Sequence, residues 1–295
     1  MKLIVELSNK NLLNKYLQFN NICYLIVGYE GLSFNSCAKF SFDEIIEINK
    51  LLKKTNVKLI LNAERLFTDK QLNKLDDLIK KGFFACFEYI TYSDFGIKIY
   101  LENKGLNIKY IFRASTYLTN SYDVNEYNLI NDYVVLSSEI SSDELIDLSK
   151  NIKKPAIIDL FGKSACFYSR RPLLTNFFKY RGMDNDPKKD NYFVVEELRN
   201  DYLSIIENEI GTVILEPKFH VLIEEINKIE NIEFGIISFY NLTQKNMIAV
   251  VNAYNNFLND YNIDDFYGLL NKTNIEYYKG AYNIKSVLLK GGCNE

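Results

Sequence analysis

The chain has 295 residues, a formal net charge of −3 and a pI near 5.5. Its length exceeds the ~100–200 residues of a typical domain but suits a single α/β barrel of ~250 residues. The charge excludes the overall basic excess of a dedicated nucleic-acid-binding domain, so any contact with RNA must use a local patch. No stretch reaches the ~18 apolar residues of a membrane-spanning helix and no signal-peptide pattern precedes residue 3, which predicts a cytoplasmic protein without membrane contact.

Short apolar runs alternate with segments of helical period along most of the chain, which is the pattern of an α/β protein. We expect strands at 3–6, 24–27, 58–61, 84–88, 110–113, 134–136, 156–160 and 234–239. Amphipathic helices are expected between them. One covers 41–53, where Ser41 and Glu44 have the spacing of a capping box, another covers 68–80, and Ser141 is placed to cap a third over 142–149.

Eight successive βα units with strands apolar enough to be buried on both faces predict a (β/α)8 TIM-type barrel, one domain over 1–295. A doubly wound open sheet remains the alternative, because periodicity does not show whether a sheet closes. The rhythm breaks over 180–215, where strand-like pieces lie at 192–197, 202–206 and 212–215. We interpret 180–215 as a small β insertion after the seventh strand, above the carboxyl ends of the barrel strands, where active sites lie.

Polar side chains follow several of the expected strands. Each alone is more often a cap or a turn residue, but together they would converge on one cavity. We expect Glu88, Asp94 and Glu139 to act there as acid–base groups, with the binding of a hard cation left open. Asn62 and Asn120 are expected to bind substrate.

The segment 161–176, FGKSACFYSRRPLLTN, follows the seventh expected strand and contains two adjacent arginines. The chain has six arginines against 29 lysines, so this pair is unusual for it. A guanidinium grips a carboxylate or a phosphate in a bidentate fork. We therefore expect Arg170 and Arg171 to bind an anion, with the question of which one faces the cavity left open. Ser169 is expected to donate hydrogen bonds to the substrate, and Tyr168 to do so as a catalytic residue.

Other patterns are weaker. His220 is the only histidine and lies in FHVLIEEI, an apolar context that favours a helix and a core or surface position. No zinc motif, phosphate loop or nucleophile motif is present. The five cysteines have no CxxC spacing, which argues against a disulfide framework, and Cys23 and Cys86 are expected to be reduced core thiols. A basic cluster near the expected mouth is suited to phosphate contacts and consists of Arg170, Arg171, Lys179, Arg181, Lys188 and Lys189.

The strand followed by FGKSACFYSRRPLLTNF resembles the signature of the peptidase U32 family, which is collagenase-like. In that family the seventh strand leads into a histidine-glycine, a cysteine, a Tyr-Ser-Gly and a second cysteine. Further parts of the resemblance are Ser-Asp-Phe-Gly at 93–96, Thr-Asn at 119–120, Leu-Ser-Ser-Glu at 136–139 and Gly-Thr at 211–212. The chain is most similar to the short, barrel-only members of low-GC Gram-positive bacteria and mollicutes.

The departures from the signature bear on cofactors. Phe161 stands in place of the histidine, and Ala165 and Pro172 stand in place of the cysteines. Some members bind an iron–sulfur cluster through cysteines of this region, but the matched positions here are not thiols. An iron–sulfur cluster is therefore not expected, and the cofactor and metal remain unknown.

The resemblance implies a role in RNA modification, namely hydroxylation of the tRNA wobble uridine by a prephenate-linked route. The implied partners are tRNA, a small dicarboxylate such as prephenate, and a longer U32 paralogue. Two alternatives stay open, a U32-type peptidase and a non-catalytic partner of such a paralogue.

Overall fold

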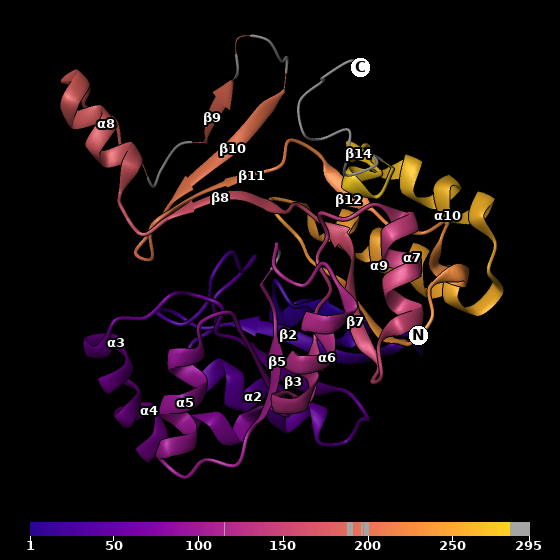
Figure 1. Ribbon diagram of the computed structural model, residues 1–295. Coiled ribbons are helices and arrows are strands. Elements are labelled where there is room, and N and C mark those ends of the chain that lie inside the picture. The colour runs from indigo at the N-terminus through magenta and orange to yellow at the C-terminus, as the bar shows by residue number, and fades with distance from the viewer. Residues whose placement is uncertain (115, 188–190, 196, 198–200, 284–295) are drawn as a thin grey trace.

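The computed structural model describes residues 1–114, 116–187, 191–195, 197 and 201–283. Within these residues the protein has a mixed α/β fold with a large, mainly parallel sheet and a smaller antiparallel sheet. Figure 1 shows helices around the parallel strands and the antiparallel sheet standing beyond one end of them. The α/β class expected from the sequence is confirmed.

Eight parallel strands form the body of the large sheet, in the order β7-β13-β1-β2-β3-β4-β5-β6. Their bounds are β1 (Lys2–Glu6), β2 (Ile22–Gly28), β3 (Lys58–Asn62), β4 (Tyr89–Tyr92), β5 (Lys109–Phe112), β6 (Tyr133–Val134), β7 (Ala156–Gly162) and β13 (Ile232–Ile237). A parallel bridge between Val135 and Ile157 joins the segment after β6 to β7. One buried cluster collects side chains from all eight strand positions: Ile4, Ile26, Ile60, Tyr89, Ile111, Val135, Ile157, Phe234 and Ile236.

Two of the helices begin at side-chain caps that the sequence predicts. Ser41 and Glu44 form a complete capping box at α2, and Ser141 forms another with Glu144 at α7. The expected segment 68–80 is split into α3 and α4 at Lys74. The helices are α1 (Leu13–Tyr16), α2 (Phe42–Leu52), α3 (Asp69–Asn73), α4 (Leu75–Lys80), α5 (Phe95–Asn103), α6 (Ser121–Ile130), α7 (Ser142–Asn151), α8 (Leu173–Arg181), α9 (Gln244–Asp260) and α10 (Ile263–Leu270). Short 3-10 turns are η1 (Lys10–Leu12), η2 (Phe83–Cys86), η3 (Ile226–Lys228), η4 (Asn271–Thr273) and η5 (Gly280–Asn283).

The fourth strand was placed wrongly from the sequence. The apolar run at 84–88 begins in the 3-10 turn η2, and the strand starts at Tyr89. Gly82 has a φ of 71°, a left-handed conformation that ends α4 and reverses the chain. Phe83 then packs its ring against those of Tyr29 and Phe42. The run is apolar because η2 packs against α2 and α4 within the buried core.

The antiparallel sheet has the order β8-β11-β10-β9. Its strands are β8 (Ala165–Ser169), β9 (Tyr192–Val195), β10 (Tyr202–Glu207) and β11 (Thr212–Leu215). The strands expected at 192–197, 202–206 and 212–215 correspond to β9, β10 and β11. The sequence did not indicate β8 or α8, which carry the chain out of the parallel sheet before residue 180. In Figure 1, α8 lies at the outer end of this sheet.

Two short strands extend the large sheet beyond β7. They are β12 (Phe219–Val221), antiparallel to β7, and β14 (Tyr277–Tyr278), parallel to β12. His220 lies in β12 opposite Gly162, so the helix expected around this histidine is wrong. The residue is buried, as the sequence favoured, but in a strand whose backbone pairs with two others.

Candidate functional site

A cavity of about 460 Å³ lies at the carboxyl ends of the parallel strands. Its walls come from residues at the ends of, or just after, β1, β3, β4, β5, β7 and β13, together with β8 and β12. This volume falls in the range of small-molecule sites. Because parallel strands direct their carboxyl ends to one edge, residues far apart in the chain meet there.

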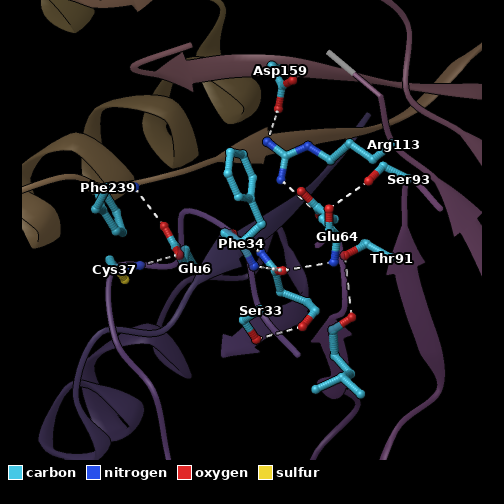
Figure 2. Close-up of polar contacts among 12 residues, drawn as sticks. Glu6, Ser33, Phe34, Cys37, Glu64, Thr91, Ser93, Arg113, Asp159 and Phe239 are labelled. Atoms are coloured by element: carbon cyan, nitrogen blue, oxygen red, sulfur yellow. Dashed lines mark hydrogen bonds and ion pairs between the residues drawn. The ribbon is translucent and has the colours of Figure 1, made fainter. Parts of the chain in front are cut away.

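Arg113 is the central charged group of the cavity (Figure 2). One terminal nitrogen donates to Asp159 Oδ1 at 2.8 Å, and the other lies 3.4 Å from Glu64 Oε1. The arginine follows β5, Glu64 follows β3, and Asp159 lies within β7. Burial lowers the pKa of the guanidinium, but attraction to these two carboxylates and to Glu6 outweighs it, so the pKa is raised and the group stays charged.

Glu6 ends β1 and is almost fully buried. Its carboxylate accepts hydrogen bonds from the backbone N–H groups of Cys37 at 2.7 Å and Phe239 at 2.9 Å (Figure 2). These bonds tie the loop after β2 and the segment after β13 to the end of β1. Glu6 therefore fixes one wall of the cavity as well as adding a carboxylate to it.

Burial raises the pKa of Glu6, although backbone hydrogen bonds and Arg113 oppose the shift. Burial also raises the pKa of Glu64, against the attraction of Arg113. The cluster of Glu6, Glu64, Asp159 and Arg113, which we call the acidic cluster, places three carboxyl groups around one guanidinium. A second anion would have to displace ion pairs that already exist. The acidic cluster is suited to a neutral ligand that can donate a hydrogen bond to a carboxylate.

The loop between β2 and α2 covers the cavity and is held by Asn62 at the end of β3. The Asn62 side chain accepts from the N–H of Phe34 at 3.1 Å and donates to its carbonyl at 3.0 Å. Ser33 Oγ donates to the Asn62 carbonyl at 2.6 Å. The Phe34 ring then meets the Tyr168 ring edge-on, with centroids 4.8 Å apart. Through these contacts Asn62 sets the position of an aromatic pair above the acidic cluster.

His220 of β12 also lines the cavity. Burial lowers the pKa of its ring, so the ring is neutral at pH 7. Its Nδ1 lies 3.5 Å from Ser164 Oγ and 4.0 Å from Glu216 Oε2. Beside it, Lys163 donates to the Pro217 carbonyl at 2.6 Å, and burial lowers the pKa of its ammonium group.

The structure brings Asn62 and Tyr168 to the cavity, as expected from the sequence. Asp94 instead caps α5, accepting from the N–H of Gly96 at 2.8 Å, and also accepts from the N–H of Phe67 at 2.7 Å. Asn120 caps α6. These are the cap roles that the sequence offered as the more common alternative.

Glu88 lies at the wrong end of its strand for the expected site. It precedes β4, and its carboxylate pairs with Lys58 at 2.8 Å and Lys109 at 2.6 Å, the first residues of β3 and β5. Hydrogen bonds from Lys109 and Lys58 lower the pKa of Glu88. The expectation failed because the fourth strand begins one residue after Glu88.

The expected anion grip also lies elsewhere. Arg170 and Arg171 are exposed at the far end of β8 and do not line the cavity. The Ser169 hydroxyl accepts from the N–H of Arg171 at 3.2 Å, a local turn contact. Glu139 is exposed after β6, and partial burial together with the charge of Glu216 raises its pKa. Lys188 and Lys189 lie outside the described residues.

The sequence analysis did not identify Glu6, Arg113 and Asp159 as site residues. Each is an ionisable residue at the end of, or inside, a short apolar run: IVEL, IFRA and IIDLF. Charged residues are rarely buried unless they are paired. A single charge in an expected buried strand was therefore the signal available in the sequence.

The described cysteines do not fit a metal cluster. Cys23, Cys37, Cys86 and Cys166 are free thiols. Within the described residues, no group of three or more His, Cys, Asp or Glu side chains is arranged to hold a metal ion. Across the same residues, no helix is long and apolar enough to cross a membrane.

Comparison with known proteins gives three similarities. The model of peptidase family U32 matches residues 20–286. The tRNA hydroxylation protein P2 of Bacillus subtilis (strain 168) is 23% identical over 219 residues, which cover 72% of this chain and 70% of that protein. The solved structure of the U32 peptidase Mk0906 has a TM-score of 0.49 and 10% identity, covering 81% of this chain and 94% of that one.

Proposed function

The chain belongs to peptidase family U32, and we propose that it takes part in the hydroxylation of uridine in tRNA, at the wobble position. Its similarity to a protein named for tRNA hydroxylation supports this function. We also propose a cytoplasmic location, where tRNA is used, and a (β/α)8 barrel, for which the Val135–Ile157 bridge between the outermost of the eight parallel strands is the support.

The acidic cluster is the observation that carries the proposal. Enzymes that modify a base in nucleic acid take it out of the stack and read its edge with hydrogen bonds in a pocket. Uracil offers one N–H donor and two carbonyl acceptors. The carboxylates of Glu6 and Glu64 can accept from that N–H, and the guanidinium of Arg113 supplies donors at the same edge of the sheet. The edge-on pair of Phe34 and Tyr168 can cover the face of the ring.

Lys163 is the cavity cation best placed for a small dicarboxylate such as prephenate. Arg113 is already held between two carboxylates, whereas Lys163 donates to a backbone carbonyl and has its pKa lowered by burial. A carboxylate beside the ammonium group of Lys163 would offset the free-energy cost of burying its positive charge. In this proposal Lys163 binds the prephenate carboxylate and the acidic cluster binds the uracil.

Nucleoside mass spectrometry of tRNA from a deletion strain tests the function. Hydroxyuridine should fall in the deletion strain and return with the wild-type gene, in a background with no redundant pathway. A gene with Glu64→Gln should fail to restore it, because the variant loses a carboxylate that faces the cavity. Glu88→Gln is the matched control, since this glutamate lies at the other end of the strands. Unchanged hydroxyuridine in the deletion strain would refute the proposal. Restoration only with a co-expressed longer paralogue would assign the chain the partner role.

The peptidase alternative has one supporting observation, the approach of Ser164 to His220. In a serine-hydrolase triad the serine and the acid contact opposite nitrogens of the ring. Here Ser164 and Glu216 both approach Nδ1, which argues against that relay. Casein cleavage by purified protein that disappears in Ser164→Ala would support the alternative. Cleavage that survives Ser164→Ala would point to a contaminating protease.

A further inference from the structure

A basic arm leads away from the cavity. We define it as residues 165–183, which comprise β8, the two arginines, α8 and its C-terminal turn. It contains four cations and no acidic residue in a chain whose net charge is −3: Arg170, Arg171, Lys179 and Arg181. Its charge therefore opposes that of the whole molecule.

The four cations are available to a partner. All four are exposed. Across the described ranges none of them forms an ion pair, whereas many other lysines and arginines do. Positive charge of this kind suits phosphate groups.

One side of α8 packs against the antiparallel sheet, and the other side is exposed to solvent. Glu207 of β10 accepts from the N–H groups of Leu174 at 2.8 Å and Thr175 at 3.2 Å, which anchors the helix N-terminus. Phe178 is buried and packs against Tyr192 with centroids 5.0 Å apart. The remaining face carries exposed aromatic rings.

Phe177 and Tyr180 are those rings, with 52% and 86% of their surface exposed. They are three residues apart, so they lie on the same side of α8, and Arg181 is four residues from Phe177. Aromatic rings interleaved with cations form the surfaces that stack unpaired bases while holding the backbone. A base-paired helix would hide the base faces that such rings need.

We propose that the basic arm binds an unpaired loop of RNA, stacking a base on Tyr180 and holding phosphates with Arg170 and Arg171. This inference rests on the proposed function, in which tRNA is the substrate. The arm also connects directly to the site, because Tyr168 of β8 lines the cavity and Arg170 is two residues further along. One RNA loop can thus lie on the arm while one of its bases enters the cavity.

Fluorescence anisotropy with the full chain tests the arm. The probe is a labelled RNA hairpin with an anticodon-sized loop, compared with the same stem as a full duplex. Tyr180→Ala should weaken hairpin binding about tenfold. Tyr122→Ala, which removes a ring on α6 that is 84% exposed, should not. Arg170→Gln with Arg171→Gln should lower the slope of log K against log salt by ~1.4, whereas Lys53→Gln with Lys54→Gln should leave it unchanged.

Hairpin binding that is unaffected by the arm variants would overturn the inference. So would arm variants that keep RNA binding but lose a protein partner in co-purification, since the arm would then be a protein interface. Equal binding of hairpin and duplex would also refute it. If the arm variants lose RNA binding while the deletion strain keeps its hydroxyuridine, the proposed function fails and the inference about the arm stands.

Discussion

Replacing Arg113 with methionine should destabilise the protein in a way that depends on pH. The change keeps much of the aliphatic volume but removes the guanidinium that contacts Asp159 and Glu64. Three carboxyl groups would then lie together without their counter-ion. Removing one partner of a buried ion pair costs about 3–5 kcal/mol, so we expect a loss of that size at pH 7.

The pH dependence follows from protonation. Burial already raises the pKa of Glu6 and Glu64, and loss of Arg113 would raise both further. A carboxyl group whose pKa is raised in the folded state binds protons more tightly when folded. Its stabilising contribution is present at low pH and is lost as pH rises through the folded pKa. The deficit of the Arg113→Met variant should therefore be smaller at about pH 5 than at about pH 7.

Urea unfolding at the two pH values measures this difference. Lys98→Met is the matched control, because Lys98 is also mostly buried but pairs with Glu102, whose side chain is 45% exposed. Glu102 keeps its contact with solvent when its partner is removed, unlike the buried carboxyl groups around Arg113, so this control should show a smaller loss with no trend in pH. An Arg113→Met deficit of equal size at both pH values would refute the electrostatic explanation and assign the loss to packing.

Three further predictions concern other parts of the molecule. Asn62→Leu should release the loop that contains Phe34, and a gene with this change should fail to restore hydroxyuridine in the deletion strain. The free energy of unfolding should fall by about 1–3 kcal/mol, because buried polar groups lose their hydrogen-bond partners. Full restoration by this variant would contradict the role given to Asn62. Glu88→Gln should leave that restoration intact and cost up to about 1 kcal/mol in urea unfolding. Because its pKa is lowered in the folded state, the contribution of Glu88 is present above about pH 4.5 and is lost as pH falls, so a cost that grows toward acid pH would contradict this assignment. Gly211→Ala should weaken hairpin RNA binding by displacing the arm, because the φ of Gly211 is 149° and an added Cβ would lie 2.1 Å from the Ser169 carbonyl; wild-type affinity would show that the arm tolerates the shift.

Much of the parallel sheet could be predicted from apolar runs alone, because buried parallel strands are apolar on both faces. Apart from the fourth strand, each lies within two residues of its expected place. The fourth failed because Phe84 and Phe87 are buried without belonging to a strand, in and after a turn that packs against α2 and α4. Apolar character indicates that a segment is buried, not whether it is a strand or a turn. Here the left-handed Gly82, where the chain reverses, is the feature that distinguishes the buried turn from a buried strand.

The site was harder to predict than the fold. Asp94 and Asn120 follow strands, yet their side chains cap the next helices, and the same residue types serve both purposes. Arg170 and Arg171 were expected at the cavity because they follow the seventh expected strand in the sequence. Instead β8 carries them to the far end of a second sheet. Pairing of β8 with β11, which lies more than forty residues later, has no local signal in the sequence.

The short β12 strand has a consequence for the order of folding. One edge of β7 pairs with two segments. Val135, just after β6, forms a bridge with Ile157, and β12 pairs with Phe161 and Gly162 further along the same edge. Because β6 has two residues, β12 supplies the backbone partners for the part of this edge that β6 does not pair with. During synthesis the ribosome delivers β6 and β7 long before β12, with the whole antiparallel sheet in between. This edge of β7 therefore cannot be completed until residue 221 has been synthesised, and neither can the wall of the cavity that contains His220.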